Sequence, residues 1–78
     1  MRPKRKLELM AAVNISLNGE EREVPDKISL DQLLDLFSMP KQRVAIEVNG
    51  KVVRRVDWLE TSIGERDRIE VVHFVGGG

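Results

Sequence analysis

The chain has 78 residues, no cysteine, and equal numbers of basic and acidic residues, thirteen of each. A chain of this length holds one small core and buries only about 60% of the surface that its unfolded state exposes, so a deep catalytic cavity is not expected. The lack of cysteine excludes a disulfide, a thiolate nucleophile, a Cys-based zinc site and a persulfide.

The first ten residues are expected to form a flexible basic N-terminal extension. Four of the thirteen bases lie among the first six residues, which leaves nine bases against thirteen acids in the rest of the chain. A mildly acidic body without a clustered basic face argues against a nucleic-acid partner. No apolar run approaches the roughly 20 residues that span a bilayer, and no long apolar segment follows the basic start. We therefore expect no membrane partner and a cytoplasmic location.

The first predicted element is a β-hairpin. Apolar and polar residues alternate from Val13 to Leu17, as a half-buried strand requires. Asn18-Gly19 suits a type I′ turn, in which both central residues need positive φ. Glu20 to Val24 should then return antiparallel as a polar second strand.

A helix with complete start signals follows. Ser29 is the expected N-cap and Gln32 completes a capping box, while Ile28 and Leu33 have the spacing of a hydrophobic staple. Pro40 is expected to end the helix. The apolar stripe follows the i, i+3, i+4, i+7 rule and predicts a helix lying on a sheet; its members are Leu30, Leu33, Leu34 and Phe37.

A second hairpin and a final strand complete the predicted fold. Arg43 to Val48 alternates, Asn49-Gly50 turns the chain into a short strand from Lys51 to Val53, and Trp58 with Leu59 should plug one end of the core. The segment from Arg68 to Val75 is apolar on both faces, which suits a central strand.

These elements predict an α+β domain over residues 11–75, with one main helix packed on one face of a mixed sheet of four to five strands. The final strand can lie parallel beside the first, with the hairpins outside. Residues 76–78 would then form a flexible C-terminal glycine tail.

The chemistry is expected at Gly76, Gly77 and Gly78. Glycines have no side chain, so this segment can act only through its backbone and the α-carboxylate. On composition alone it is either a frayed end or a narrow tail that threads into a partner enzyme.

The pattern of strand, Asn-Gly turn, strand and capped helix, with "VAIEVNGKVV" and "DRIEVVHFVGGG", resembles the sulfur carriers of thiamine biosynthesis. This is the ThiS family of the ubiquitin-like β-grasp superfamily, and the resemblance covers about Val13 to Gly78. It implies that a ThiF-like enzyme adenylates the Gly78 carboxylate and that a thiocarboxylate then forms, with Gly77 and Gly76 as the tail. A cysteine desulfurase or another donor would supply the sulfur indirectly, and a ThiG-like thiazole synthase would receive it.

The resemblance further implies that this chain is a protein co-substrate and not an enzyme. ATP and magnesium would belong to the activating partner, and no cofactor is expected on this chain. The residues themselves agree, because they include no nucleophile paired with a base, no metal cluster and no phosphate-binding loop.

The expected partner contacts lie on the final strand. Val72 and Phe74 share one face, which should leave an apolar patch that the helix does not cover, and such patches commonly mark partner sites. His73 is the only histidine, and without a second histidine or a cysteine we interpret it as a contact or packing residue. No catalytic or metal-binding side chain is assigned.

Three alternatives remain open from the sequence. A MoaD-like molybdopterin sulfur carrier would also end in a glycine pair and undergo the same activation. A ubiquitin-like modifier would pass its carboxylate to lysine amines. A plain interaction domain of the same fold would bind partners without using its tail.

Overall fold

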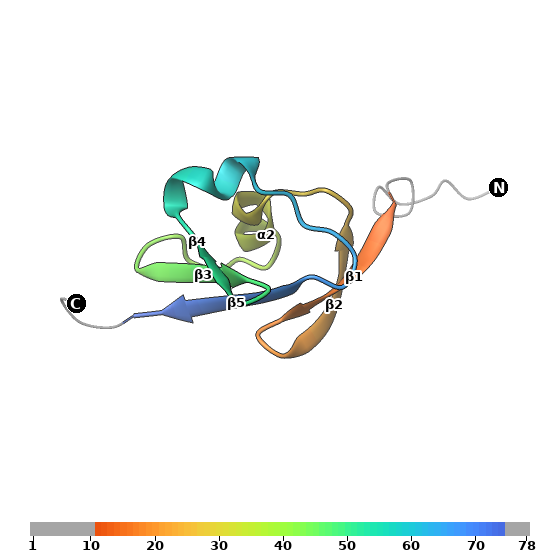
Figure 1. Ribbon diagram of the computed structural model, residues 1–78, viewed down its shortest axis with the longest axis horizontal. Helices are drawn as coiled ribbons and strands as arrows, with labels where there is room; N and C mark the ends of the chain where they lie inside the picture. Colours follow the sequence, from red (N-terminus) through yellow and green to blue (C-terminus); the bar gives the residue numbers. More distant parts are fainter. Residues whose placement is uncertain (1–10, 75–78) are drawn as a thin grey trace.

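The computed structural model describes residues 11–74 of the chain (Figure 1). The predicted extension over residues 1–10 and the glycine tail over residues 76–78 lie outside this range, as does Val75. The described elements are, in order, β1 (Ala12–Leu17), β2 (Glu20–Pro25), α2 (Leu30–Leu36), β3 (Val44–Val48), β4 (Lys51–Val53), the 3₁₀ helix η1 (Arg55–Glu60) and β5 (Arg68–His73).

The five strands form one mixed sheet in the order β2-β1-β5-β3-β4. β5 is central, pairs parallel with β1 and antiparallel with β3, and leaves both hairpins outside, as predicted. Its parallel pairing with β1 is short and covers only Ser16 with Arg68 and Leu17 with Ile69. Figure 1 shows α2 and η1 on the same side of the sheet, so the other face of the sheet is open.

Both hairpins turn at the predicted Asn-Gly pairs. Asn18 and Gly19 have φ of 51° and 84°, and Asn49 and Gly50 have φ of 53° and 87°. Asparagine and glycine are the residues that enter this left-handed region most readily. The local sequence therefore accounts for the two turns without help from the rest of the fold.

The capping box of α2 is present as predicted. The amide of Gln32 donates to Ser29 Oγ at 3.1 Å, and the amide of Ser29 donates to Gln32 Oε1 at 2.9 Å. The helix ends at Leu36, before the predicted stop at Pro40, because the chain leaves the helical region at Ser38, which has a φ of 54°.

The core lies between α2, η1 and the covered face of the sheet. Twelve apolar residues form it: Val13, Ile15, Leu17, Val24, Leu30, Leu33, Leu34, Val44, Ile46, Trp58, Ile63 and Ile69. The other stripe position, Phe37, is partly buried against this cluster, and so is Ile28 of the predicted staple.

Only one of the two residues expected to plug the core does so. Trp58 is buried and its indole Nε1–H donates to the carbonyl oxygen of Val53 at 3.0 Å. Leu59 is 73% exposed, so its assignment to the core was wrong. A 3₁₀ helix has three residues per turn, which places Leu59 directly above Val56 on the solvent side of η1 while Trp58 points inward.

Candidate functional site

The candidate site begins where β5 leads into the terminal glycines. Gly76, Gly77 and Gly78 lie outside the described residues. The structure describes the strand that precedes them in the sequence, β5, and the contacts that hold it. His73 lies opposite Val44 in the β3–β5 ladder, and the amide of Phe74 donates to the carbonyl oxygen of Arg43 at 2.9 Å. Backbone pairing with β3 therefore continues up to the last residue described.

The open face of β5 carries the predicted apolar patch. Val72 lies opposite Ala45, and the side chains of Val72 and Phe74 are 50% and 48% exposed. Residues two apart on a strand share a face, so these two side chains form an apolar surface at the C-terminal end of β5. We call Val72 and Phe74 the β5 patch.

His73 is not part of the β5 patch. It lies opposite Val44, which is buried in the core, and residues directly opposite in a ladder share a face. The His73 side chain is therefore on the helix side, where it is exposed at the edge of the core. The three predicted contact residues are neighbours in sequence but occupy two surfaces.

Asn18 ties the first hairpin to β5 through its side chain. Its amide donates to the carbonyl oxygen of Ile69 at 2.9 Å, and its side-chain Oδ1 accepts the amide of Val71 at 2.7 Å. Asn18 thus continues the hydrogen-bonding pattern of β1 for one more step after β1 has ended.

Asn49 holds the other side of the same strand. Its amide donates to the carbonyl oxygen of Arg68 and its Oδ1 accepts the amide of Arg68, both at 2.8 Å. Its Nδ2 also donates to Asp67 Oδ1 at 3.0 Å. Sequence reasoning assigned both asparagines to turn chemistry and missed this second role, for which the identical Asn-Gly pair in each hairpin was the available signal.

The open face is acidic next to the β5 patch. Glu47 and Glu70 lie directly opposite one another in the β3–β5 ladder. On β2, Glu21 lies opposite Ser16 and Glu23 opposite Asn14, which puts both carboxylates on the same open face. A partner that covers the β5 patch therefore meets negative charge beside it.

The loop after α2 is held by an ion cluster on the helix side. Lys41 Nζ lies 2.9 Å from Asp35 Oδ1 and 3.1 Å from Asp31 Oδ2. The hydrogen bonds that the Lys41 ammonium donates to Asp35 and, to a smaller extent, to Asp31 raise the pKa of Lys41 above its ordinary value of 10.5. Because both carboxylates belong to α2, these ion pairs hold the loop that connects α2 to β3 against the helix.

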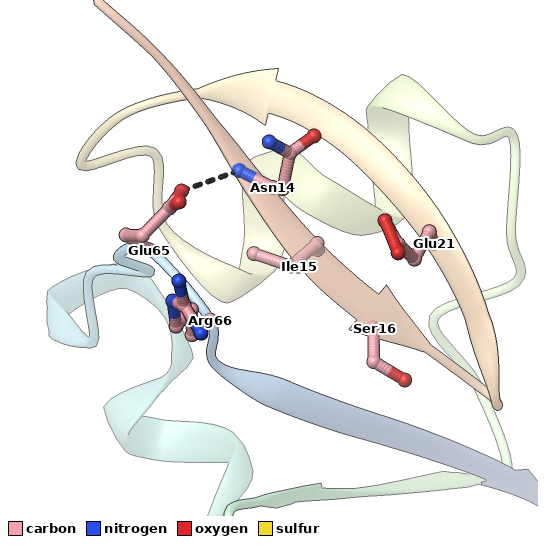
Figure 2. A pocket seen from close by; sticks show the side chains of 6 residues that line it. All are labelled: Asn14, Ile15, Ser16, Glu21, Glu65 and Arg66. Carbon is pink, nitrogen blue, oxygen red and sulfur yellow. Dashed lines mark hydrogen bonds between the residues drawn. The ribbon is translucent and has the colours of Figure 1, made fainter.

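A hollow of about 380 Å³ lies beside β1, but its polar groups serve the fold (Figure 2). Glu65 Oε1 accepts the amide of Asn14 at 2.7 Å, and the amide of Arg66 donates to the carbonyl oxygen of Asn14 at 2.7 Å. These bonds replace ladder bonds that β5 does not supply to the first half of β1. The Glu65 carboxylate is thus a structural hydrogen-bond acceptor for the backbone of β1.

Residues 11–74 contain neither a metal-binding cluster nor a membrane-spanning helix. No group of three or more histidine, cysteine, aspartate or glutamate residues in this range is placed to hold a metal ion. None of the helices in the same range has the length and apolar character that crossing a membrane would need.

Comparison with known families gives one family match. The sequence model of the ThiS family matches residues 8–78. A sulfur carrier protein ThiS from Bacillus subtilis is 32% identical over 65 residues, which cover 82% of this chain and 98% of that protein.

Two further relatives are thiazole synthases. The protein from Magnetococcus marinus is 39% identical and the protein from Paramagnetospirillum magneticum 29% identical, each over 66 residues. In both cases the match covers 85% of this chain but only 20% of the synthase. The chain therefore spans about a fifth of the length of these relatives.

The fold also matches a solved structure. The crystal structure of the thiamine biosynthesis protein (ThiS) from Geobacter metallireducens has a TM-score of 0.76 and 28% sequence identity, and the match covers 85% of this chain and all of that one. The mixed five-stranded sheet with one main helix is thus the ubiquitin-like β-grasp fold expected from the sequence.

Proposed function

Because this chain belongs to the ThiS family of sulfur carriers in thiamine biosynthesis, we propose that the α-carboxylate of Gly78 is the group that carries the sulfur. Membership of this family makes the protein a carrier and not an enzyme. The observation that supports the assignment of Gly78 is the run of three glycines that begins three residues after the end of β5. The fold holds β5 on the β1 side as far as the amide of Val71 and on the β3 side as far as Phe74.

The chemistry requires activation because a carboxylate is a resonance-stabilised anion that resists nucleophiles. A ThiF-like enzyme would transfer AMP from ATP to the Gly78 carboxylate with release of pyrophosphate, which removes the charge and creates a good leaving group. The terminal sulfur of a persulfide, supplied by a cysteine desulfurase or another donor, would then attack the carbonyl carbon and displace AMP. A thiol would cleave the remaining S–S bond and leave the thiocarboxylate. Magnesium and positive groups on the enzyme would stabilise the phosphate charge.

This chain contributes shape and position to that reaction. Gly76 and Gly77 lack a Cβ, so they can pass through a channel too narrow for a side chain. Ordering each residue of the tail costs on the order of 1–2 kcal/mol of backbone entropy, which the folded body must offset by docking. We propose that the β5 patch and His73 make part of that docking contact, because their side chains are exposed on the last strand before the tail in the sequence.

The thiazole synthases suggest where the sulfur goes. In those relatives the region similar to this chain is about a fifth of one longer polypeptide. Joining a carrier to the enzyme that uses it raises the effective concentration of one for the other. We infer that a ThiG-like thiazole synthase receives the sulfur from this carrier.

No observation on the described residues favours the other three functions considered from the sequence. The ThiS family match and the relatives named for thiamine biosynthesis favour the thiamine pathway over a molybdopterin carrier, a modifier or a plain interaction domain. A cytoplasmic location fits this chemistry, because ATP and reduced thiols are both available there.

Intact mass spectrometry tests the proposal. The protein would be incubated with ATP, magnesium, cysteine, a cysteine desulfurase and the ThiF-like enzyme, with a sample lacking ATP as control. We expect the mass of the intact protein to increase by the difference between sulfur and oxygen only when ATP is present, and the C-terminal peptide released by proteolysis to carry the same increase. An unchanged mass, with an enzyme that converts the Bacillus subtilis carrier in parallel, would reject Gly78 as the sulfur-carrying residue.

A further inference from the structure

We propose that the free edge of β5 at Val71 and His73 pairs through its backbone with an extended segment of the adenylating enzyme. This inference rests on the proposed function and adds to it a specific mode of docking. The segment that pairs with this edge is extended and carries apolar side chains. The hydrogen bonds are made by main-chain groups, so no side-chain pattern in the sequence indicates this contact.

The direction of the β5 backbone groups follows from its pairing with β3. The amide of Phe74 donates to Arg43 of the chain that leads into β3. Backbone groups of successive residues in a strand point to opposite sides, and hydrogen-bonded pairs in an antiparallel ladder alternate with pairs that are not hydrogen-bonded. Val72 therefore directs its groups toward β3, and Val71 and His73 direct theirs toward the side of β1.

On that side β1 ends too early to reach them. The last β1 residue paired with β5 is Leu17, opposite Ile69, and Asn18 then caps Ile69 and the amide of Val71. Within residues 11–74 no strand lies beside the carbonyl of Val71 or the amide and carbonyl of His73. Figure 1 shows β5 continuing past the end of the β1–β2 hairpin toward the C-terminus.

Both faces beside this edge can receive side chains. The β5 patch lies on the open face. On the helix side a hollow of about 230 Å³ adjoins the end of β1, and it is lined by Leu17, Asn18, Glu20, Arg22, Phe37 and Met39. A strand placed beside β5 would send alternate side chains toward the patch and toward this hollow.

The position of the edge selects the occupant. His73 is only five residues before Gly78 in the sequence, so an enzyme that binds Gly78 has its surface within about 17 Å of this edge. A second copy is a poor candidate, because three backbone groups give a contact far below the roughly 1,000 Å² of a stable interface.

Such pairing would serve the reaction. An added strand would hold β5 and the residues after it in extended form, which is the form that can thread a narrow channel. It would also satisfy the free groups without any requirement on the side chains of β5, as strand addition does in other recognition systems.

Amide hydrogen exchange measured by NMR tests the pairing in the intact chain. The probe is the ThiF-like enzyme with magnesium and a non-hydrolysable ATP analogue. We expect the His73 amide to exchange quickly in the free carrier and at least tenfold more slowly in the complex. An unchanged His73 exchange rate in a saturated complex would overturn the proposal.

A pair of variants tests the same contact by affinity. His73→Pro removes the free amide and the side chain, whereas His73→Ala removes only the side chain, and proline is tolerated where the N–H of a strand faces solvent. We expect similar thermal midpoints for the two variants, but an affinity for the enzyme about tenfold lower for His73→Pro. Equal affinities would contradict backbone pairing.

The remaining outcomes identify other occupants. His73 exchange that is slow in the dilute free carrier would assign the edge to the chain itself, and protection that grows with carrier concentration would assign it to a second copy; either result overturns the proposal. Conversion of wild-type Gly78 to the thiocarboxylate with an unprotected His73 would reject the pairing and keep the proposed function. A protected His73 without conversion would keep the pairing and reject the sulfur chemistry.

Discussion

The Oδ1 of Asn18 accepts the backbone amide of Val71 at 2.7 Å, although the two residues are 53 positions apart in the sequence. This bond stands where the next residue of β1 would have been if the strand had continued. Asn49 makes the equivalent bond to Arg68 on the other side of β5. The strand that carries the glycine tail is therefore held by the turn residues of both hairpins.

Asn18→Gly should separate the two roles of Asn18, which are to form the turn and to accept the amide of Val71 with its side chain. Glycine keeps the positive φ of the turn but removes the acceptor for Val71, whose amide can then bond to water. We expect a loss of about 0.5–1.5 kcal/mol in the free energy of unfolding. Denaturant unfolding would measure it, and faster exchange of the Val71 amide would locate it.

Asn49→Gly is the matched comparison for Asn18→Gly. It removes one acceptor for Arg68 and one donor to Asp67, so we expect it to destabilise the domain more than Asn18→Gly does. If neither variant changes the free energy of unfolding, the two side chains contribute nothing beyond turn formation, and the claim that they stabilise β5 is wrong.

Removing one carboxylate from the Glu47–Glu70 pair should stabilise the domain. Like charges directly opposite in a ladder repel, and cross-strand pairs are worth roughly 0.2–1 kcal/mol. We expect Glu70→Gln to raise the free energy of unfolding by an amount in that range at low salt, and by less at high salt because salt screens exposed charges. Glu21→Gln is the control, since Glu21 faces Ser16 and no acid. An equal gain in both variants would point to net charge instead of the pair.

Much of the fold could be predicted because its signals are local. The Asn-Gly pairs set two turns, and the capping box of Ser29 and Gln32 set the start of α2. The apolar character of both faces placed β5 in the centre of the sheet. Each of these features depends on residues within a few positions of one another.

The features that were missed depend on three-dimensional placement. Leu59 was assigned to the core because it is apolar and follows Trp58, but the three-residue period of η1 turns it to solvent. The bond from Asn18 to β5 depends on where the pairing of β1 with β5 stops, at Leu17 and Ile69, because only then does the side chain of the turn residue face the amide of Val71. Strand alternation already implies that His73 lies on the opposite face of the sheet from Val72 and Phe74. All three residues were nevertheless assigned to partner contacts from the sequence, without separating the two faces.

The β5 patch should affect docking without affecting the fold. Val72 and Phe74 are about half exposed, so Val72→Ala and Phe74→Ala remove little core packing. If the patch contacts the adenylating enzyme, we expect each to weaken binding by about tenfold, equivalent to about 1.4 kcal/mol. Calorimetric titration of the carrier into the ThiF-like enzyme would measure this.

Leu59→Ala is the control for the β5 patch. Leu59 is 73% exposed on η1 and belongs neither to β5 nor to the proposed contact, so its loss should leave the affinity unchanged. A weaker affinity for Leu59→Ala together with normal affinities for Val72→Ala and Phe74→Ala would move the contact surface from β5 to η1.

The glycine tail gives the sharpest test of threading. Gly77→Ala adds a Cβ and restricts the backbone inside the proposed channel, whereas deletion of Gly78 still leaves a glycine as the last residue. We expect the rate of thiocarboxylate formation to fall tenfold or more for Gly77→Ala, a loss of at least about 1.4 kcal/mol in transition-state stabilisation. The deletion should be only partly harmful. Timed mass spectrometry of the C-terminal peptide would compare the two variants under identical conditions. Normal conversion of Gly77→Ala would show that the tail does not pass through a narrow channel, and the proposed reason for glycine at this position would then be wrong.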